Sequence, residues 1–284
     1  MNQTQDYLDN EYNPRLRVPD HMAVMQGWRR KSKLALKQGT YISDVRYGDE
    51  EGETADIFPA PLSAGGDAPV LVFIHGGYWR GLDKADFSFI APPLVKAGAA
   101  VYMPNYALAP AVPIEHIVEQ CADAVAWIYN NASRYGGSRD RIYVAGHSAG
   151  GHLAAMMMTK GRRSSSGFEL ESIVRGVLAI SGLYDLKPLI PADFLKNDLK
   201  LDERRAALIS PVNLIPSGKA PLLTCVGGSE SAEFQRQNKA IREAWKDVFA
   251  FDIPMPGINH YSIMDEAANP GSMLFKAIVK MLDL

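Results

Sequence analysis

Eight short apolar runs, each bounded by glycine, proline or polar residues, recur along the chain and predict β-strands. They begin near residues 40, 54, 69, 99, 141, 174, 221 and 248. The first two runs alternate apolar and polar positions, as edge strands do. The middle runs are apolar on both faces, which is typical of parallel strands that helices cover on both sides.

Between these runs, apolar residues recur at helical spacing. Strand and helix alternate from about residue 69 onward, which predicts a doubly wound α/β sheet in one domain spanning residues 1–284. The segment 184–214 contains three prolines and lacks helical periodicity, so we expect a small cap over the sheet edge there. The helices are expected at 87–97, 114–133, 149–158, 232–247 and 273–282.

Composition narrows the class of protein. The 284 residues are 47% apolar, enough for a sizeable core, and their net charge of −2 offers no basic face for nucleic acid or an anionic membrane. The N-terminus has no apolar signal region, and no run of about 18 apolar residues predicts a membrane span. Two cysteines, Cys121 and Cys225, make no disulfide framework, so a cytoplasmic protein is expected.

A Gly-x-Ser-x-Gly pentapeptide lies at residues 146–150, directly after the predicted strand at 141 and directly before a predicted helix. This strand, sharp turn and helix are what a nucleophile elbow requires. Ser148 at its centre is therefore the candidate nucleophile, and the helix N-terminus favours negative charge beside it.

A serine hydroxyl needs a base to accept its proton. Where the nucleophile sits on such an elbow, the acid and then the histidine follow it along the chain. Of the six histidines only His152 and His260 follow Ser148, and His152 is too close to leave room for the acid. His260, in a loop after the last strand, is the predicted base.

The acid should lie on a loop after a strand, where it can hold the imidazole tautomer and stabilise the imidazolium. Glu230 follows the strand at 221 by a short glycine turn, and Asp185 follows the strand at 174. The penultimate strand normally supplies this residue, so Glu230 is favoured and Asp185 stays the alternative.

The segment "HGGYW" at 75–79 ends the first core strand. Preorganised backbone N–H groups stabilise the oxyanion of a tetrahedral intermediate, and a loop at this position supplies them. As in HGGG-type loops, the N–H groups of Gly77 and Tyr78 are expected to act with that of Ala149, while Gly76 shapes the turn. His75 is expected to brace the loop by hydrogen bonding.

Several of these segments together resemble the α/β-hydrolase superfamily, and more narrowly the serine-dependent kynurenine formamidases (arylformamidases), whose mark is HGGxW. Where those enzymes usually have aspartate, Glu230 stands here, and "NYALAP" is also similar to hormone-sensitive-lipase-like esterases. The segments are "EYNPR" at 11–15, "HGGYW", "NYALAP" at 105–110, "GHSAGGHLAA" at 146–155, "SGLYDLKPL" at 181–189 and "NHYS" at 259–262.

The resemblance implies hydrolysis of N-formyl-L-kynurenine to L-kynurenine and formate through an acyl-enzyme, with no metal or organic cofactor. The residues alone indicate acyl transfer to a small-molecule substrate, with Tyr78 and Trp79 forming a mouth that would suit an aryl group. A broader carboxylesterase, or an amidase or carbamate hydrolase, remains the alternative. A non-catalytic binding protein on the same scaffold is a third reading, and a homodimer is left open.

Overall fold

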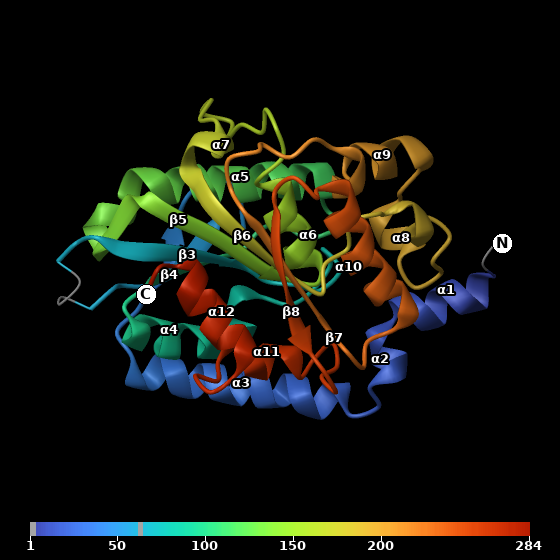
Figure 1. Ribbon diagram of the computed structural model, residues 1–284, viewed down its shortest axis with the longest axis horizontal. Helices are drawn as coiled ribbons and strands as arrows, with labels where there is room; N and C mark the ends of the chain where they lie inside the picture. Colours follow the sequence, from blue (N-terminus) through green and yellow to red (C-terminus); the bar gives the residue numbers. More distant parts are fainter. Residues whose placement is uncertain (1–3, 62–64) are drawn as a thin grey trace.

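The computed structural model describes residues 4–61 and 65–284. Over these residues the chain forms one eight-stranded sheet in the order β1-β2-β4-β3-β5-β6-β7-β8 (Figure 1). β2 is antiparallel to β1 and β4, and all other neighbouring strands are parallel. The eight predicted strands and the mostly parallel sheet are therefore confirmed. The strands are β1 (Ile42–Arg46), β2 (Thr54–Phe58), β3 (Ala68–Ile74), β4 (Ala100–Pro104), β5 (Gly137–His147), β6 (Val174–Ile180), β7 (Leu222–Gly227) and β8 (Phe249–Met255).

The second strand, β2, differs from its prediction as an edge strand. It lies between β1 and β4, and residues 55–58 are buried. Asp56, a polar position that indicated solvent contact, is buried and lies 2.9 Å from the ammonium group of Lys84. Because a buried charge is tolerated when it is paired, an alternating pattern alone does not place a strand at the edge.

Helices cover both faces of the sheet, as predicted (Figure 1). The helices α5, α6 and α10 pack on one face, and α3, α4, α11 and α12 pack on the other. All five predicted helices are present, and the one expected over 87–97 begins as a 3₁₀ turn at Ser88–Ile90 before α4. The helices are α1 (Gln5–Tyr12), α2 (Pro14–Arg17), α3 (His21–Gln38), α4 (Ala91–Ala97), α5 (Ile114–Asn131), α6 (Ala149–Met156), α7 (Leu170–Ile173), α8 (Lys196–Leu199), α9 (Glu203–Leu208), α10 (Ala232–Ala244), α11 (Ile263–Ala267) and α12 (Met273–Met281).

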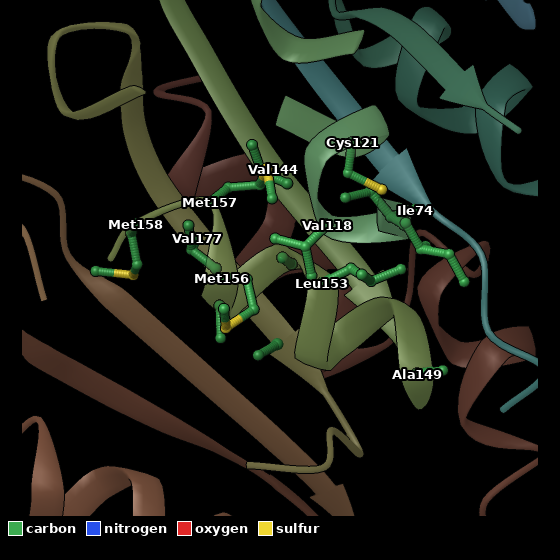
Figure 2. Close-up of a cluster of buried hydrophobic side chains, with 14 of the residues drawn as sticks. Ile74, Val118, Cys121, Val144, Ala149, Leu153, Met156, Met157, Met158 and Val177 are labelled. Carbon is green, nitrogen blue, oxygen red and sulfur yellow. The ribbon is translucent and has the colours of Figure 1, made fainter. Parts of the chain in front are cut away.

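The core between the sheet and the helices α5 and α6 fixes the position of the predicted nucleophile. Figure 2 shows Val118 of α5 and Leu153 and Met156 of α6 packed with Val144 of β5 and Val177 of β6. Every residue of α6 is buried. Since burying one such apolar side chain contributes about 1.5–3 kcal/mol, this contact holds α6 and the turn before it firmly on the sheet.

The N-terminal helices α1, α2 and α3 were not predicted from the sequence. The 18-residue α3 buries Trp28 and Ser32, whereas its apolar residues Met22 and Leu34 are exposed. A helix with so narrow a buried stripe gives little periodic signal.

The segment 184–214 contains the short helices α8 and α9 and the 3₁₀ turns Lys187–Leu189 and Pro211–Asn213. Leu186, Leu189 and Leu195 join the core cluster on the α5 and α6 face. That this segment acts as a cap, within a single domain spanning residues 1–284, stays a prediction.

Candidate active site

Ser148 lies in the sharp turn between β5 and α6, with φ 57° and ψ −119°. Such a backbone conformation is unfavourable for a residue with a side chain and persists only where its surroundings impose it. The N–H of Ser148 donates to the carbonyl of Ile180 at 2.8 Å, which ties the turn to β6.

The two glycines of the pentapeptide are required by close backbone contacts. A Cβ at Gly146 would overlap the carbonyl oxygen of Gly150, and a Cβ at Gly150 would overlap that of Ile74 in β3. The local sequence therefore permits a turn that a larger residue at either position would prevent.

His260 and Glu230 are in direct contact in the interior. His260 Nδ1 lies 2.6 Å from Glu230 Oε2, and the two side chains are 6% and 0% exposed. The other carboxylate oxygen accepts hydrogen bonds from Ser181 Oγ at 2.5 Å and from the N–H of Gly227 at 2.7 Å. Because a carboxylate only accepts, Nδ1 carries the proton and Nε2 is left as an acceptor. His260 and Ser148 line the same cavity.

Asp185, the alternative acid, has different partners. Its carboxylate lies 3.2 Å from Arg236, and its own backbone N–H and carbonyl are bonded to the side chain of Gln237. The structure thus brings Glu230 to His260 and pairs Asp185 with an arginine.

The loop that follows β3 has an unusual backbone. Gly77, Tyr78 and Trp79 have φ values of 113°, 52° and 56°. A Cβ at Gly76 would lie 2.7 Å from the carbonyl oxygen of His147 and 3.2 Å from Ser148 Cβ, so the loop packs directly on the elbow. The loop places its backbone beside Ser148, as the oxyanion prediction requires. The roles of the individual N–H groups, including that of Ala149, stay predictions.

His75 is bonded within the loop that it begins. Its Nδ1 lies 2.8 Å from the carbonyl oxygen of Gly76, and its ring stacks on Tyr106 with 4.3 Å between centroids. The Tyr106 hydroxyl donates to the His75 carbonyl at 2.8 Å. Burial lowers the pKa of His75, so the imidazole is neutral. These contacts fit the bracing role expected of it.

Ser148 and His260 line a cavity of about 500 Å³. Four aromatic residues line it together with Asn13, Pro14 and Arg15 of the N-terminal segment. The aromatic residues are Trp28, Tyr78, Phe194 and Tyr261.

The family model BD-FAE matches residues 56–244 of the chain. The chain belongs to the BD-FAE family. A kynurenine formamidase of Danio rerio is 29% identical over 289 residues, covering 97% of this chain and 94% of that protein. One of Salmo salar is 29% identical over 264 residues, covering 87% of each chain. A solved Silicibacter sp. TM1040 protein, provisionally named a thioesterase, superposes with a TM-score of 0.82 at 28% identity, covering 98% of this chain and 99% of that one.

These relatives and the sheet order support an α/β-hydrolase fold and a serine hydrolase. The resemblance to kynurenine formamidases drawn from the sequence motifs is therefore confirmed.

In this BD-FAE protein Trp79 does not line the pocket, although the sequence analysis predicted that it would. Tyr78 lines the cavity, but Trp79 is fully buried and lies outside the lining. Its indole N–H donates to His152 Nδ1 at 3.3 Å, and His152 Nε2 donates to the Ile209 carbonyl at 2.7 Å. Burial lowers the pKa of His152 to about 4, so its Nδ1 is free to accept. The prediction for Trp79 is wrong because its indole is buried against the ring of His152 and does not face the cavity.

His147 was missed by the sequence analysis. Its Nε2 donates to the carbonyl of His260 at 2.9 Å, and the two ring centroids are 4.7 Å apart. Burial and the neighbouring His260 hold the pKa of His147 well below its usual range. A neutral His147 therefore fixes the backbone of the predicted base. Its place next to Ser148 in the pentapeptide was the available signal.

The N-terminal contribution was also missed. Tyr12 accepts a hydrogen bond at its carbonyl from the Tyr78 hydroxyl, and its own hydroxyl donates to Glu233 at 2.7 Å. The motif "EYNPR" at 11–15, already noted as similar to formamidases, was the signal that could have placed this segment at the site.

Among residues 4–61 and 65–284, no three His, Cys, Asp or Glu side chains are grouped so that they could hold a metal ion. Cys121 and Cys225 are buried and unpaired. Over the same ranges, no helix combines the length and apolar character needed to cross a membrane.

Proposed function

We propose that this BD-FAE protein hydrolyses an aryl formamide such as N-formyl-L-kynurenine, giving L-kynurenine and formate through an acyl-enzyme on Ser148. The observation that carries the proposal is the buried Glu230–His260 pair, in which His260 lines the same cavity as Ser148. The kynurenine formamidases among its relatives favour the formamide as substrate.

In the first step, Ser148 Oγ attacks the formyl carbon while His260 Nε2 takes the hydroxyl proton. Glu230 holds the imidazole through Nδ1 and stabilises the imidazolium that forms. The negative charge on the carbonyl oxygen is stabilised by the N–H groups of Gly77, Tyr78 and Ala149, each worth on the order of 10² to 10³ in rate.

In the second step, the carbon–nitrogen bond breaks and His260 returns its proton to the departing aryl amine. A water molecule, deprotonated by His260, then attacks the formyl ester on Ser148. Formate leaves, and the proton returns to the serine oxygen. Every proton is carried by His260, so the chemistry calls for no metal ion and no organic cofactor.

The cavity suits an aryl group. The rings of Trp28, Tyr78, Phe194 and Tyr261 provide flat apolar contacts for the leaving group. A formyl carbon bears only hydrogen, so a tight acyl side gains nothing from added methylenes.

The test is kcat/KM measured on N-formyl-L-kynurenine, p-nitrophenyl acetate, p-nitrophenyl butyrate and an aryl carbamate. We expect the formamide to be the best substrate and the butyrate ester to be poorer than the acetate, with no loss on adding a metal chelator. Brisk turnover of butyrate or carbamate without formamide hydrolysis would select the broader esterase, amidase or carbamate hydrolase instead. Absence of turnover of every substrate would favour the non-catalytic binding protein.

We also infer a cytoplasmic protein, because both cysteines are buried free thiols. A homodimer stays a prediction, and the sedimentation velocity of the purified protein would test it.

A further inference from the structure

Two arginines line the same cavity as Ser148 and His260. Arg15 reaches it from the start of α2, and Arg80 reaches it from the loop after β3. Among the described lining residues, Asp198 is the sole carboxylate. The imidazole of His147, whose pKa is held well below its usual range, adds no charge. The cavity wall therefore carries an excess of positive charge.

Arg80 is already neutralised within the fold. Its guanidinium pairs with Asp198 and lies 5.9 Å from the centre of the Phe194 ring. This pair joins the loop after β3 to the segment 184–214 across the cavity.

Arg15 has no such partner: no carboxylate of the described residues forms an ion pair with it. Arg15 and Tyr261 line the same cavity, and the charge of Arg15 opposes the rise in the pKa of Tyr261 that burial causes. A guanidinium that lines a cavity and has no carboxylate partner is suited to bind an anion.

The backbone beneath Arg15 is held in place. Asn13 Oδ1 accepts from the N–H of Arg15 at 3.2 Å, and Glu11 Oε2 accepts from the N–H of Glu233 at 3.2 Å. The buried Tyr12 hydroxyl also accepts from Gln237 at 2.9 Å. These contacts anchor the segment 11–15 on α10, so the backbone that carries Arg15 is held in place.

We propose that Arg15 forms an anion subsite that binds the carboxylate of an aryl amino acid substrate, with the aryl ring among the aromatic residues of the cavity. The proposal rests on the proposed function for the identity of the bond that is cleaved. The subsite selects substrates that bear a carboxylate over neutral aryl formamides with the same reacting group.

The first test compares N-formyl-L-kynurenine with 2′-formamidoacetophenone, the same aryl formamide without the amino acid. The ratio of their kcat/KM values cancels effects on the shared chemistry. We expect Arg15→Gln to lower this ratio by on the order of tenfold, through KM of the charged substrate, and Arg15→Lys to restore part of it. The wild-type ratio should fall as salt is added, since charge attraction is screened.

The matched control is Arg30→Gln, which removes the same charge from an exposed position of α3 outside the cavity lining. We expect it to leave the ratio unchanged. An equal fall in both variants would show long-range attraction rather than a subsite and would overturn the proposal.

The second test needs no catalysis. Calorimetric titration with L-kynurenine and with 2′-aminoacetophenone should show tighter binding of L-kynurenine to the wild type, and loss of that preference in Arg15→Gln. No preference in the wild type, or a preference that survives Arg15→Gln, overturns the subsite even where formamide hydrolysis is observed. An Arg15-dependent preference without formamide hydrolysis keeps the subsite and rejects the proposed function.

Discussion

Replacing Glu230 with glutamine keeps the size of the side chain and removes the charge beside His260. One carboxylate oxygen accepts from Ser181 and Gly227, and the other accepts from His260 Nδ1. In Glu230→Gln the amide oxygen would keep the first pair of donors, so its NH₂ group would face Nδ1. Imidazole would then carry its proton on Nε2, where it can no longer accept one from Ser148.

The expected effect is large because the contact is short and dry. The Glu230 side chain is 0% exposed and lies 2.6 Å from the imidazole, so water does not screen the lost interaction. A wrong histidine tautomer in such a constellation lowers kcat by about 10³ to 10⁴, which is about 4 to 5.5 kcal/mol of transition-state stabilisation. KM should change little, since Glu230 does not line the cavity.

The assay is steady-state hydrolysis of the best substrate by wild type, Glu230→Gln and Asp185→Asn. Asp185 and Arg236 form a partly exposed pair, 28% and 38%, whose loss costs about 0–1 kcal/mol of stability. The control should therefore retain most of its kcat. If Glu230→Gln stays within tenfold of wild type while remaining folded by near-UV circular dichroism, Glu230 does not orient the base and the reasoning fails.

Three other outcomes follow from the same geometry. Ser148→Ala should abolish acyl transfer and leave the melting temperature nearly unchanged, and more than a few per cent residual kcat would reject it as nucleophile. Gly150→Ala should be destabilised by about 3 kcal/mol or more in urea unfolding, because its Cβ meets the Ile74 carbonyl, whereas Gly27→Ala in α3 meets no atom within 4 Å and should be neutral or stabilising. Burial lowers the pKa of His152 to about 4 in the folded protein, against an ordinary value of 6.5 in the unfolded chain. Between these two pH values the unfolded chain therefore binds a proton that the folded protein does not. The stabilisation of about 3 kcal/mol from His152 is therefore present above pH 6.5 and lost as the pH falls towards 4. Urea unfolding of His152→Gln across that range should show a shallower pH dependence than the wild type, and an equal slope would show that His152 does not titrate on unfolding.

The sequence alone determined the elements whose signal is local. Most β-strands are short apolar runs, and the first two alternate apolar and polar positions. The elbow needs only a strand, a small-residue turn and a helix in direct succession, so β5, Ser148 and α6 could be placed without the fold. His260 followed from chain order once the elbow was recognised. The narrow buried stripe of α3 gave no comparable signal, and that helix was missed.

The tertiary structure decided what depends on contacts between distant segments. Glu230 and Asp185 each follow a strand, and only packing brings one of them to His260 and the other to Arg236. Trp79 follows Tyr78 in the chain, yet the positive φ values of the loop send its indole to His152 beneath the surface. The N-terminal segment reaches the cavity because Tyr12 bonds to Glu233, 221 residues away. Side-chain periodicity reports the surroundings of one element, whereas these neighbours are set by how the elements pack together.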